Sequence, residues 1–246
     1  MAANDERSLG DLVRRCEQMQ PARGFRDRLA MDAPQAIAVI SEIKRKSPSK
    51  GFLRADLDPQ FLADAYQAGG ASCLSVLTDE DFFEGSIEDL QIAAAACTLP
   101  VLRKDFTVSA HDVCDTRLMG ADCVLLIAAA LEPHELKDLH HLATSIGLDV
   151  LVEIHDEAEL EVALFAEATL IGVNQRDLVT FEVDHQRALR MAGLIPSGVL
   201  RVAESGVRGP ADALALHQAG YHAVLVGESL VTADDPAGAV RALRNL

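Results

Sequence analysis

The sequence has few aromatic residues and no tryptophan. Phe, Tyr and Trp together make up 4% of its 246 residues, while hydrophobic residues as a whole make up 49%. Any core must therefore be built from Ala, Leu, Val and Ile. Such a composition suits short parallel strands that are covered on both faces by helices, and it excludes a chain that is disordered throughout.

Long apolar runs, paired cysteines and an excess of positive charge are also missing. No apolar stretch reaches about 18 residues, so we expect no membrane-spanning helix, and the polar N-terminus lacks the pattern of a secretory signal. The formal net charge of −16 disfavours nucleic acid and anionic membranes as partners. No CxxC pair occurs, so the cysteines are predicted to be reduced, mostly buried thiols in the cytoplasm: Cys16, Cys73, Cys97, Cys114 and Cys123.

Lysine is scarce as well. Only five of the 22 basic residues are lysine, and four of them fall in the segments IKRKSPSKG (43–51) and LRKDF (102–106). A lysine can release its proton and an arginine effectively cannot, so these lysines are candidates for proton transfer. A general preference for arginine explains the scarcity equally well. We also expect the lysines in these segments to form a local positive cluster that outweighs the diffuse acidity of the chain.

One pattern repeats from residue 35 to the C-terminus: a short apolar run, a loop and an amphipathic helix. There are eight such runs, at 36–43, 72–77, 99–103, 122–128, 149–154, 169–173, 198–203 and 222–227. Eight strands that alternate with helices predict an α/β protein with a (β/α)8 TIM barrel. An open doubly wound sheet is the alternative, but no GxGxxG motif follows the first run.

Helix boundaries support this pattern. Asp58 and Pro59 predict a helix start, as does Ser109, and glycines such as Gly120 and Gly147 predict helix ends. Residues 1–34 are predicted to form a short helical N-terminal extension that packs on the barrel, because the segment is too short to bury a core of its own. Residues 35–246 are predicted to be the catalytic barrel.

Polar residues recur at the ends of the predicted strands, where active sites of this fold lie. In strands, residues two apart share a face, so Lys104 and Glu153 are expected to point inward with Leu102 and Leu151. The full set of such residues is Glu42, Lys44, Lys104, Glu153, Asn174, Arg176, Glu204 and Ser205. His155 follows Glu153 and is interpreted as a structural or supporting residue. No histidine has metal-ligand spacing, so no metal is predicted.

The loops after the last two strands carry glycine and serine in the segments ESG and VGES. In many barrels these loops present backbone N–H groups to a phosphate. Gly206 and Gly227 would let the backbone approach the anion closely, and Ser47 could reach the same site.

Several longer motifs are similar to those of the indole-3-glycerol-phosphate synthase family of tryptophan biosynthesis. They are SEIKRKSPSKG, LTD followed by FFEGS, LRKDF, ADCVLLIAA, VEIHDEAEL, IGVNQRDL, VAESGV and LVGESL, in the family's order from about Pro21 onward. One departure is Gln175, where the family usually has Asn. An amide is retained, so we expect little change.

The resemblance implies a cofactor-free carboxy-lyase. Its substrate would be 1-(2-carboxyphenylamino)-1-deoxyribulose 5-phosphate, and its products indole-3-glycerol phosphate, CO₂ and water. Lys104 matches the general acid, and Glu153 and Lys44 match the acid–base groups of the later steps. Glu42 would orient the lysines and Phe106 would stack on the aromatic ring. The resemblance also implies that the substrate hydroxyls and the polar network are held by Asn174, Arg176 and Glu204. It implies that the phosphate is bound by Ser47, Gly206, Gly227 and the backbone at Glu228.

Two other functions remain open from the residues alone. A phosphoribosylanthranilate isomerase would need a Cys/Asp pair, whereas these strand ends carry Lys and Glu. A non-catalytic barrel that binds sugar phosphates would have no use for a matched acid and base. The expected partner is a small phosphorylated substrate, and the chain is expected to act in the cytoplasm as a monomer, with a weak dimer as the alternative.

Overall fold

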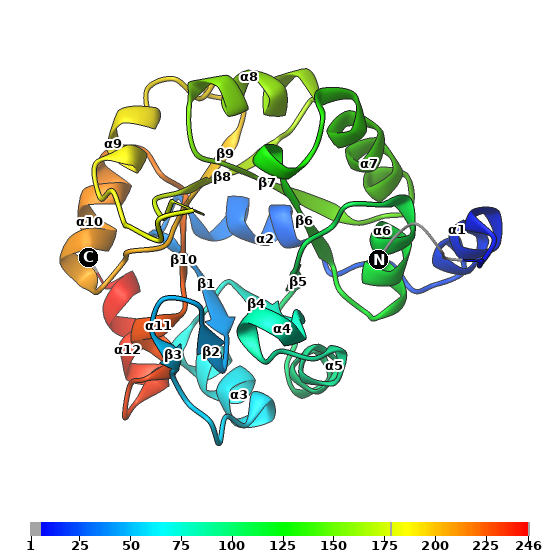
Figure 1. The fold of residues 1–246 in the computed structure, drawn as a ribbon. Helices are drawn as coiled ribbons and strands as arrows, with labels where there is room; N and C mark the ends of the chain where they lie inside the picture. Colours follow the sequence, from blue (N-terminus) through cyan, green and yellow to red (C-terminus); the bar gives the residue numbers. More distant parts are fainter. Residues whose placement is uncertain (1–5, 178, 246) are drawn as a thin grey trace.

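The eight apolar runs form the strands of a closed barrel in this computed structural model, which describes residues 6–177 and 179–245 (Figure 1). Neighbouring strands are parallel throughout, in the order β1-β10-β9-β8-β7-β6-β5-β4, and β4 pairs with β1 to close the ring. Each strand lies within two residues of its predicted bounds. The strands are β1 Ala38–Ile43, β4 Cys73–Leu77, β5 Val101–Lys104, β6 Cys123–Ile127, β7 Asp149–Ile154, β8 Leu170–Asn174, β9 Leu200–Glu204 and β10 Ala223–Val226.

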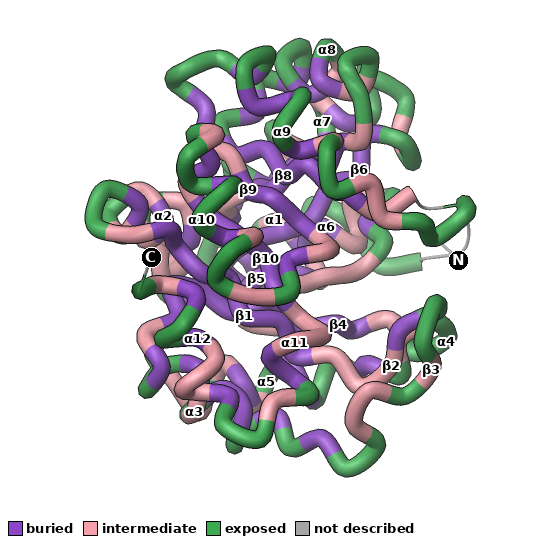
Figure 2. The backbone as a smooth tube through the Cα atoms, turned by 90° about the vertical axis from the view of Figure 1, so that its left-hand side faces the viewer, coloured by how far each residue is buried: buried purple, intermediate pink, exposed green. Residues whose placement is uncertain are grey.

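Helices follow every strand and surround the barrel, with their outer faces exposed and the strands buried (Figure 2). They are α3 Pro59–Gly69, α4 Glu80–Phe83, α5 Ile87–Ala96, α6 Ala110–Leu118, α7 Pro133–Ser145, α8 Glu157–Phe165, α9 Arg187–Met191, α10 Pro210–Gln218, α11 Glu228–Val231 and α12 Pro236–Arg244. A small hairpin, β2 (Lys46–Ser47) and β3 (Gly51–Phe52), projects after β1. None of the described helices has the length and hydropathy needed to cross a membrane. The prediction of a (β/α)8 barrel is confirmed.

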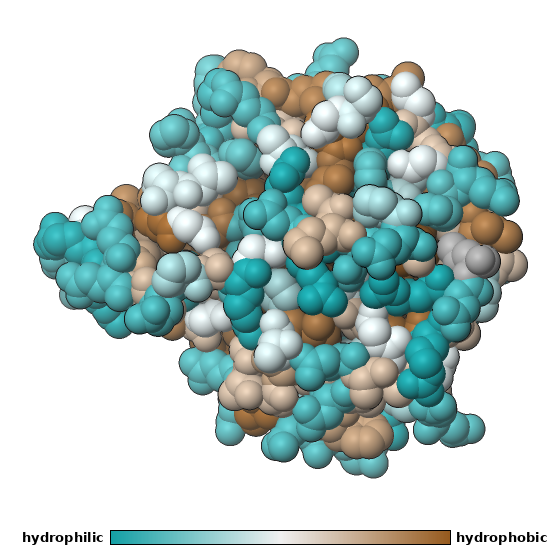
Figure 3. Space-filling model, turned by 180° about the vertical axis from the view of Figure 1, so that it is seen from behind, coloured by the Kyte–Doolittle hydropathy of each residue, from teal (hydrophilic) through white to brown (hydrophobic). Residues whose placement is uncertain are grey.

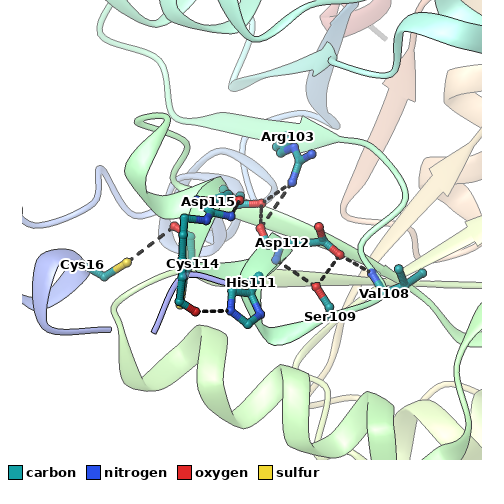
Figure 4. Close-up of polar contacts among 10 residues, drawn as sticks. Cys16, Arg103, Val108, Ser109, His111, Asp112, Cys114 and Asp115 are labelled. Atoms are coloured by element: carbon teal, nitrogen blue, oxygen red, sulfur yellow. Dashed lines mark hydrogen bonds and ion pairs between the residues drawn. The ribbon is translucent and has the colours of Figure 1, made fainter. Parts of the chain in front are cut away.

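The predicted helix boundaries have the expected local chemistry. The Asp58 carboxylate accepts hydrogen bonds from the main-chain N–H groups of Gln60 and Phe61, and Pro59 is the first helical residue of α3. Ser109 caps α6: its hydroxyl accepts from the Asp112 N–H at 3.2 Å and lies 2.8 Å from the Asp112 carboxylate (Figure 4). The glycines that end α3, α6, α7 and α10 all have left-handed φ values, a conformation that costs glycine little: Gly70, Gly120, Gly147 and Gly220.

The two helices expected in the N-terminal extension are α1 (Leu9–Glu17) and α2 (Phe25–Asp32). Helix α2 covers the amino-terminal end of the barrel, where Phe25 and Leu29 are fully buried against interior side chains such as Ile40 and Leu102. The extension therefore completes the barrel interior at this end. Seen from behind, the molecule has a mostly hydrophilic surface with separate apolar patches (Figure 3).

Helix α1 packs on α6. The Cys16 thiol points at the main-chain carbonyl of Cys114, 3.5 Å away (Figure 4). The Arg7 guanidinium forms two hydrogen bonds of 2.7 Å with the Asp115 carboxylate. All five cysteines are free, and all but the partly buried Cys97 are buried. The division of the chain at residues 34 and 35 stays a prediction.

Asp122 fastens the segment between α1 and α2 to the barrel. Its carboxylate is 3% exposed and accepts hydrogen bonds of 2.8 Å from the Arg23 main chain, the Arg23 side chain and the Val101 main chain. We expect Asp122→Ala to lower the free energy of unfolding by about 3–5 kcal/mol, because it leaves a partly buried guanidinium and a buried N–H without their acceptor.

Urea unfolding followed by circular dichroism measures this effect. The matched control is Asp11→Ala, since Asp11 forms an exposed ion pair with Arg14 that should contribute less than about 1 kcal/mol. Equal losses in the two variants would show that Asp122 does not anchor the extension.

Candidate active site

A cavity of about 560 Å³ opens at the carboxyl ends of the barrel strands, on the side opposite α2. Every residue predicted for the site lines it: Glu42, Lys44, Ser47, Lys104, Phe106, Glu153, Asn174, Arg176, Glu204, Ser205, Gly206, Gly227 and Glu228. They come from six strands and the loops that follow them. The inward direction inferred from alternation is confirmed, because Leu102, Leu151 and Val202 lie in the barrel interior beneath Lys104, Glu153 and Glu204.

Two lysine–glutamate pairs form the floor of the cavity. The Lys104 ammonium lies 3.2 Å from Oε2 of Glu153, and the Lys44 ammonium lies 2.5 Å from Oε1 of Glu42. Both carboxylates are buried, at 1% and 5% exposure, whereas each lysine keeps part of its surface open to the cavity. Charged side chains at this depth must be paired, because an isolated buried charge costs several kcal/mol.

Asn174 and Glu204 extend this floor. The Asn174 side-chain amide donates a 3.0 Å hydrogen bond to Oε1 of Glu153, and its own oxygen accepts from the main-chain N–H of Arg176. The Glu204 carboxyl group is 2% exposed and packs over Gly172, where a Cβ atom would lie 1.9 Å from its Oε1. Gly172 is thus required by the close approach of this side chain.

The pKa values of Glu204, Glu153 and Lys104 on the cavity floor are shifted in different directions. Burial, reinforced by the nearby Glu153 carboxylate, raises the pKa of Glu204 well above its usual range. Burial also opposes ionisation of Glu153, but Lys104 and the Asn174 amide outweigh it and lower the pKa of Glu153. The pKa of Lys104 is lowered by burial and raised more strongly by the three surrounding carboxyl groups. The floor therefore favours the protonated form of Glu204 beside an ion pair of Lys104 and Glu153.

One end of the cavity is lined by polar loop residues. Ser205 and Gly206 follow β9 with φ values of 64° and 75°, which turn the chain sharply at the cavity wall. Helix α11 begins at Glu228, and the first turn of a helix presents N–H groups without intrahelical partners. The Ser47 hydroxyl, 8% exposed, comes from the hairpin after β1. This end offers main-chain donors to an anion.

Glycine is needed at position 227 for a different reason from the one expected. Its φ of −115° is open to any residue, but a Cβ atom would lie 2.2 Å from Oε1 of Glu42 and 3.2 Å from the Lys44 ammonium. Glycine therefore makes room for the Glu42–Lys44 pair, a contact that the sequence pattern did not indicate.

The opposite end of the cavity is apolar. Phe106 is 46% exposed and meets Phe82 edge to face, with ring centroids 6.2 Å apart. Further apolar lining comes from the ends of β4, β6 and the following loops: Leu77, Phe83, Leu125 and Ile127. The cavity thus has an apolar end, an acid–base floor and an anion-binding end.

The expectation of a positive lysine cluster is wrong. Each of the four lysines in these segments is within 3.3 Å of a glutamate: Lys44 with Glu42, Lys46 with Glu84, Lys50 with Glu228 and Lys104 with Glu153. These pairs offset the positive charge of the lysines. Two arginines are further cations on the cavity wall: Arg176, whose guanidinium donates to the Phe181 carbonyl at 2.9 Å, and Arg208.

Several lining residues were not predicted, among them Phe181, Val183 and His185 in the loop after β8. This loop folds back over the cavity through the bridge between Arg176 and Val183 and the hydrogen bond from Asp184 N–H to Gln175 O, 2.8 Å long. The signal in the sequence was Phe181, a large apolar residue between Thr180 and Glu182. Gln175 donates to the Ser205 carbonyl at 2.8 Å and so supports the turn at Gly206.

Solved structures with low sequence identity share the fold. A thiamine phosphate pyrophosphorylase from Pyrococcus furiosus superposes with a TM-score of 0.62 at 13% identity, covering 86% of this chain and 95% of that structure. An N-acetylmannosamine-6-phosphate 2-epimerase from Clostridium perfringens gives a TM-score of 0.62 at 12% identity, covering 82% and 89%.

Sequence comparison is more specific. The sequence model of indole-3-glycerol phosphate synthase matches residues 1–243. Proteins with that name from Bordetella pertussis and Polaromonas naphthalenivorans are 47% and 52% identical over 235 and 206 residues, which is 95% and 84% of this chain and 90% and 78% of theirs. The chain belongs to the indole-3-glycerol phosphate synthase family.

Proposed function

We propose that this chain is an indole-3-glycerol phosphate synthase, a carboxy-lyase that converts 1-(2-carboxyphenylamino)-1-deoxyribulose 5-phosphate to indole-3-glycerol phosphate, CO₂ and water. The observation that carries the proposal is the Lys104–Glu153 pair on the floor of a cavity with an apolar end and an anion-binding end. The substrate has the same division, with an aromatic ring at one end and a phosphate at the other.

The substrate fits in one direction. Its ring would lie against Phe106 at the apolar end, and its phosphate at the N–H groups near Gly206 and Glu228, with the Ser47 hydroxyl nearby. The ketose carbonyl then lies between these ends, over Lys104. Lys44 would hold the ring carboxylate, and Arg176, Asn174 and Glu204 would contact the sugar hydroxyls and the polar network.

Ring closure comes first. The ring carbon that bears the carboxylate attacks the ketose carbonyl carbon, and the carbonyl π electrons move to oxygen, which takes a proton from Lys104. The nitrogen lone pair supplies electrons to the ring and becomes an iminium. The bond to CO₂ then breaks, and its electron pair neutralises the iminium. The substrate's own nitrogen is thus the electron sink, and the prediction that no cofactor or metal is required stays a prediction.

Dehydration completes the reaction. Glu153, held as a carboxylate, removes a proton from the ring methylene beside nitrogen, and the hydroxyl group leaves as water with a proton from an acid on the floor. Lys44 can supply that proton, and so can Glu204, whose raised pKa favours its protonated form. Glu42 orients Lys44 through their 2.5 Å contact.

The anion-binding end gives a prediction about binding. Gly206→Ala places a Cβ at a left-handed φ of 75°, where it would also lie 2.6 Å from Cγ1 of Val183. The turn must shift and move its N–H groups from the phosphate, so we expect KM to rise about tenfold, a loss of about 1.4 kcal/mol of binding, while kcat changes less.

Steady-state kinetics on Gly206→Ala and Gly198→Ala test this. A Cβ atom at Gly198 would have no neighbour within 4 Å, and this residue precedes β9, outside the cavity, so Gly198→Ala should leave KM unchanged. An unchanged KM in Gly206→Ala would place the phosphate elsewhere.

The experiment that tests the function compares two candidate substrates. Purified enzyme is incubated either with the carboxyphenylamino-deoxyribulose phosphate or with phosphoribosylanthranilate, and indole fluorescence, released CO₂ and the consumption of each substrate are followed. Indole and CO₂ in equal amounts from the first substrate are expected. Turnover of the second substrate alone would make the chain an isomerase, and binding of both without turnover would make it a sugar-phosphate binder.

A further inference from the structure

His155 lies beside Glu153 of the active-site floor, between two carboxylates. It follows β7, and its Nδ1 is 2.9 Å from Oε2 of Glu159 in the first turn of α8. Its Nε2 is 3.6 Å from Oε1 of Glu153. The main-chain N–H of His155 donates to the same Glu159 oxygen at 2.7 Å, which fixes that carboxylate beside the ring. The imidazole side chain is 12% exposed.

The chemistry of these contacts determines the charge of the ring. An ionised carboxylate can only accept hydrogen bonds, and a neutral imidazole has one nitrogen that can only accept. A neutral His155 would therefore turn a lone pair toward one of its two carboxylates. Nε2 is buried and has no hydrogen-bond partner among the described residues, so its interaction with Glu153 is attractive only if it carries a proton. The imidazolium satisfies both sides.

The contacts on Glu153 divide between its two oxygens. Lys104 approaches Oε2, whereas Asn174 and His155 approach Oε1. When Lys104 gives its proton to the substrate, Oε2 loses its cation while Oε1 keeps both of its partners. A second, non-reacting positive charge would then keep Glu153 ionised for the proton removal that follows.

We propose that His155 is a protonated positioning residue, held by Glu159, that keeps Glu153 as a carboxylate until Glu153 removes the ring proton. The catalytic part of this proposal rests on the proposed function. His155 itself does not touch the substrate, since it is absent from the cavity lining.

The other charged groups around the ring support this charge state on balance. Burial lowers the pKa of His155, and so does Arg187 of α9, but Glu159 and Glu153 outweigh them and raise it. Lys104 is on the far side of Glu153. A raised pKa means that the imidazolium persists to higher pH than for an ordinary histidine. In turn, His155 contributes to the lowered pKa of Glu153, after Lys104 and Asn174.

Removing the imidazolium should move the pH profile in a defined direction. In His155→Asn the pKa of Glu153 rises, so the base is lost at a higher pH and the acid limb of the kcat/KM profile shifts upward. At a pH below both limbs, the activity relative to wild type falls about tenfold for each pH unit of that shift. Glu159→Gln, which leaves the ring in place but removes its anchor charge, should give a smaller shift in the same direction.

Two measurements test the proposal, and the first needs no substrate. Nitrogen-15 NMR of the ligand-free wild type at pH 7 should show both ring nitrogens of His155 protonated, with the signal assigned by its absence in His155→Asn. A neutral ring would overturn the proposal whatever the enzyme does. The second measurement is the kcat/KM profile of wild type, His155→Asn, Glu159→Gln and the exposed control His141→Asn.

The expected result is an upward shift of the acid limb in the first two variants and none in the control. An unchanged acid limb in both His155→Asn and Glu159→Gln would overturn the positioning role even if the ring is charged. If His155→Asn fails to fold, the Glu159→Gln profile still decides the positioning role, and the His155 signal of the wild type is assigned by its shift in Glu159→Gln. A charged ring in a wild type that shows no turnover would contradict the proposed function and, with it, the catalytic part of this proposal.

Discussion

Lys104→Met should lower kcat by about 10³-fold while the protein stays folded. A general acid contributes about 10²–10⁴-fold to a rate, and Lys104 is the basic residue next to the buried Glu153 on the cavity floor. Methionine is similar in length and carries no proton to donate. The fold should persist because Glu153 keeps the Asn174 hydrogen bond and the neighbouring His155.

Turnover followed by indole fluorescence, with circular dichroism as the check on folding, measures this loss. Lys137→Met is the matched control, because Lys137 lies on the outer helix α7 and pairs with Glu167 at 3.5 Å; it should turn over like wild type. Lys104→Arg adds a sharper comparison, since arginine keeps the charge but does not release a proton. Full activity in Lys104→Arg would mean that only the charge at this position is used.

Glu153→Gln should also lower kcat by about 10²–10⁴-fold, because the amide cannot remove the proton from the ring methylene. The amide retains the size of the side chain and can accept from Asn174, so binding and folding should change little. Lys104 loses the carboxylate that raises its pKa most. The alkaline limb of the pH profile, where Lys104 loses its proton, should therefore move to lower pH.

Glu161→Gln provides the control for this substitution. Glu161 is an exposed residue of α8, and its neutralisation should change neither kcat nor the pH profile. A kcat for Glu153→Gln within a factor of a few of wild type would transfer the base to another group, with Lys44 the first to examine.

The barrel was predictable from the sequence because each strand is buried on both faces. Such strands are continuous apolar runs with clear ends, as at 149–154, where prediction and structure coincide. Caps such as Asp58 and Ser109 act within one turn, so local sequence determined them as well. The placement of the site residues followed from two rules, the alternation of side chains along a strand and the position of active sites at strand ends.

Other features depend on residues that are distant in the sequence. Gly227 makes room for Glu42 and Lys44, which are far from it along the chain. The raised pKa of Glu204 depends on burial and on Glu153, neither of which a motif reveals. The pairing of each clustered lysine with a glutamate likewise arises from packing. Counting the lysines within their two segments could not show these partners, so it predicted a positive cluster.

His155 shows how far the sequence can predict a contact of the site. It stands two residues after Glu153, on the same face by strand alternation, and this suggested a supporting residue. Alternation does not give the second contact, because only the turn from β7 into α8 places Glu159 against Nδ1 while Nε2 faces the Glu153 carboxylate. The pair of contacts is thus a property of the strand end rather than of the strand.

The most direct test of the central claim is a single-turnover experiment with enzyme in excess over the carboxyphenylamino-deoxyribulose phosphate. We expect one burst of indole fluorescence per substrate molecule, with one CO₂ released, and loss of the burst in both Lys104→Met and Glu153→Gln. Substrate that binds by calorimetry but gives no indole in the wild type would contradict the assignment of a synthase.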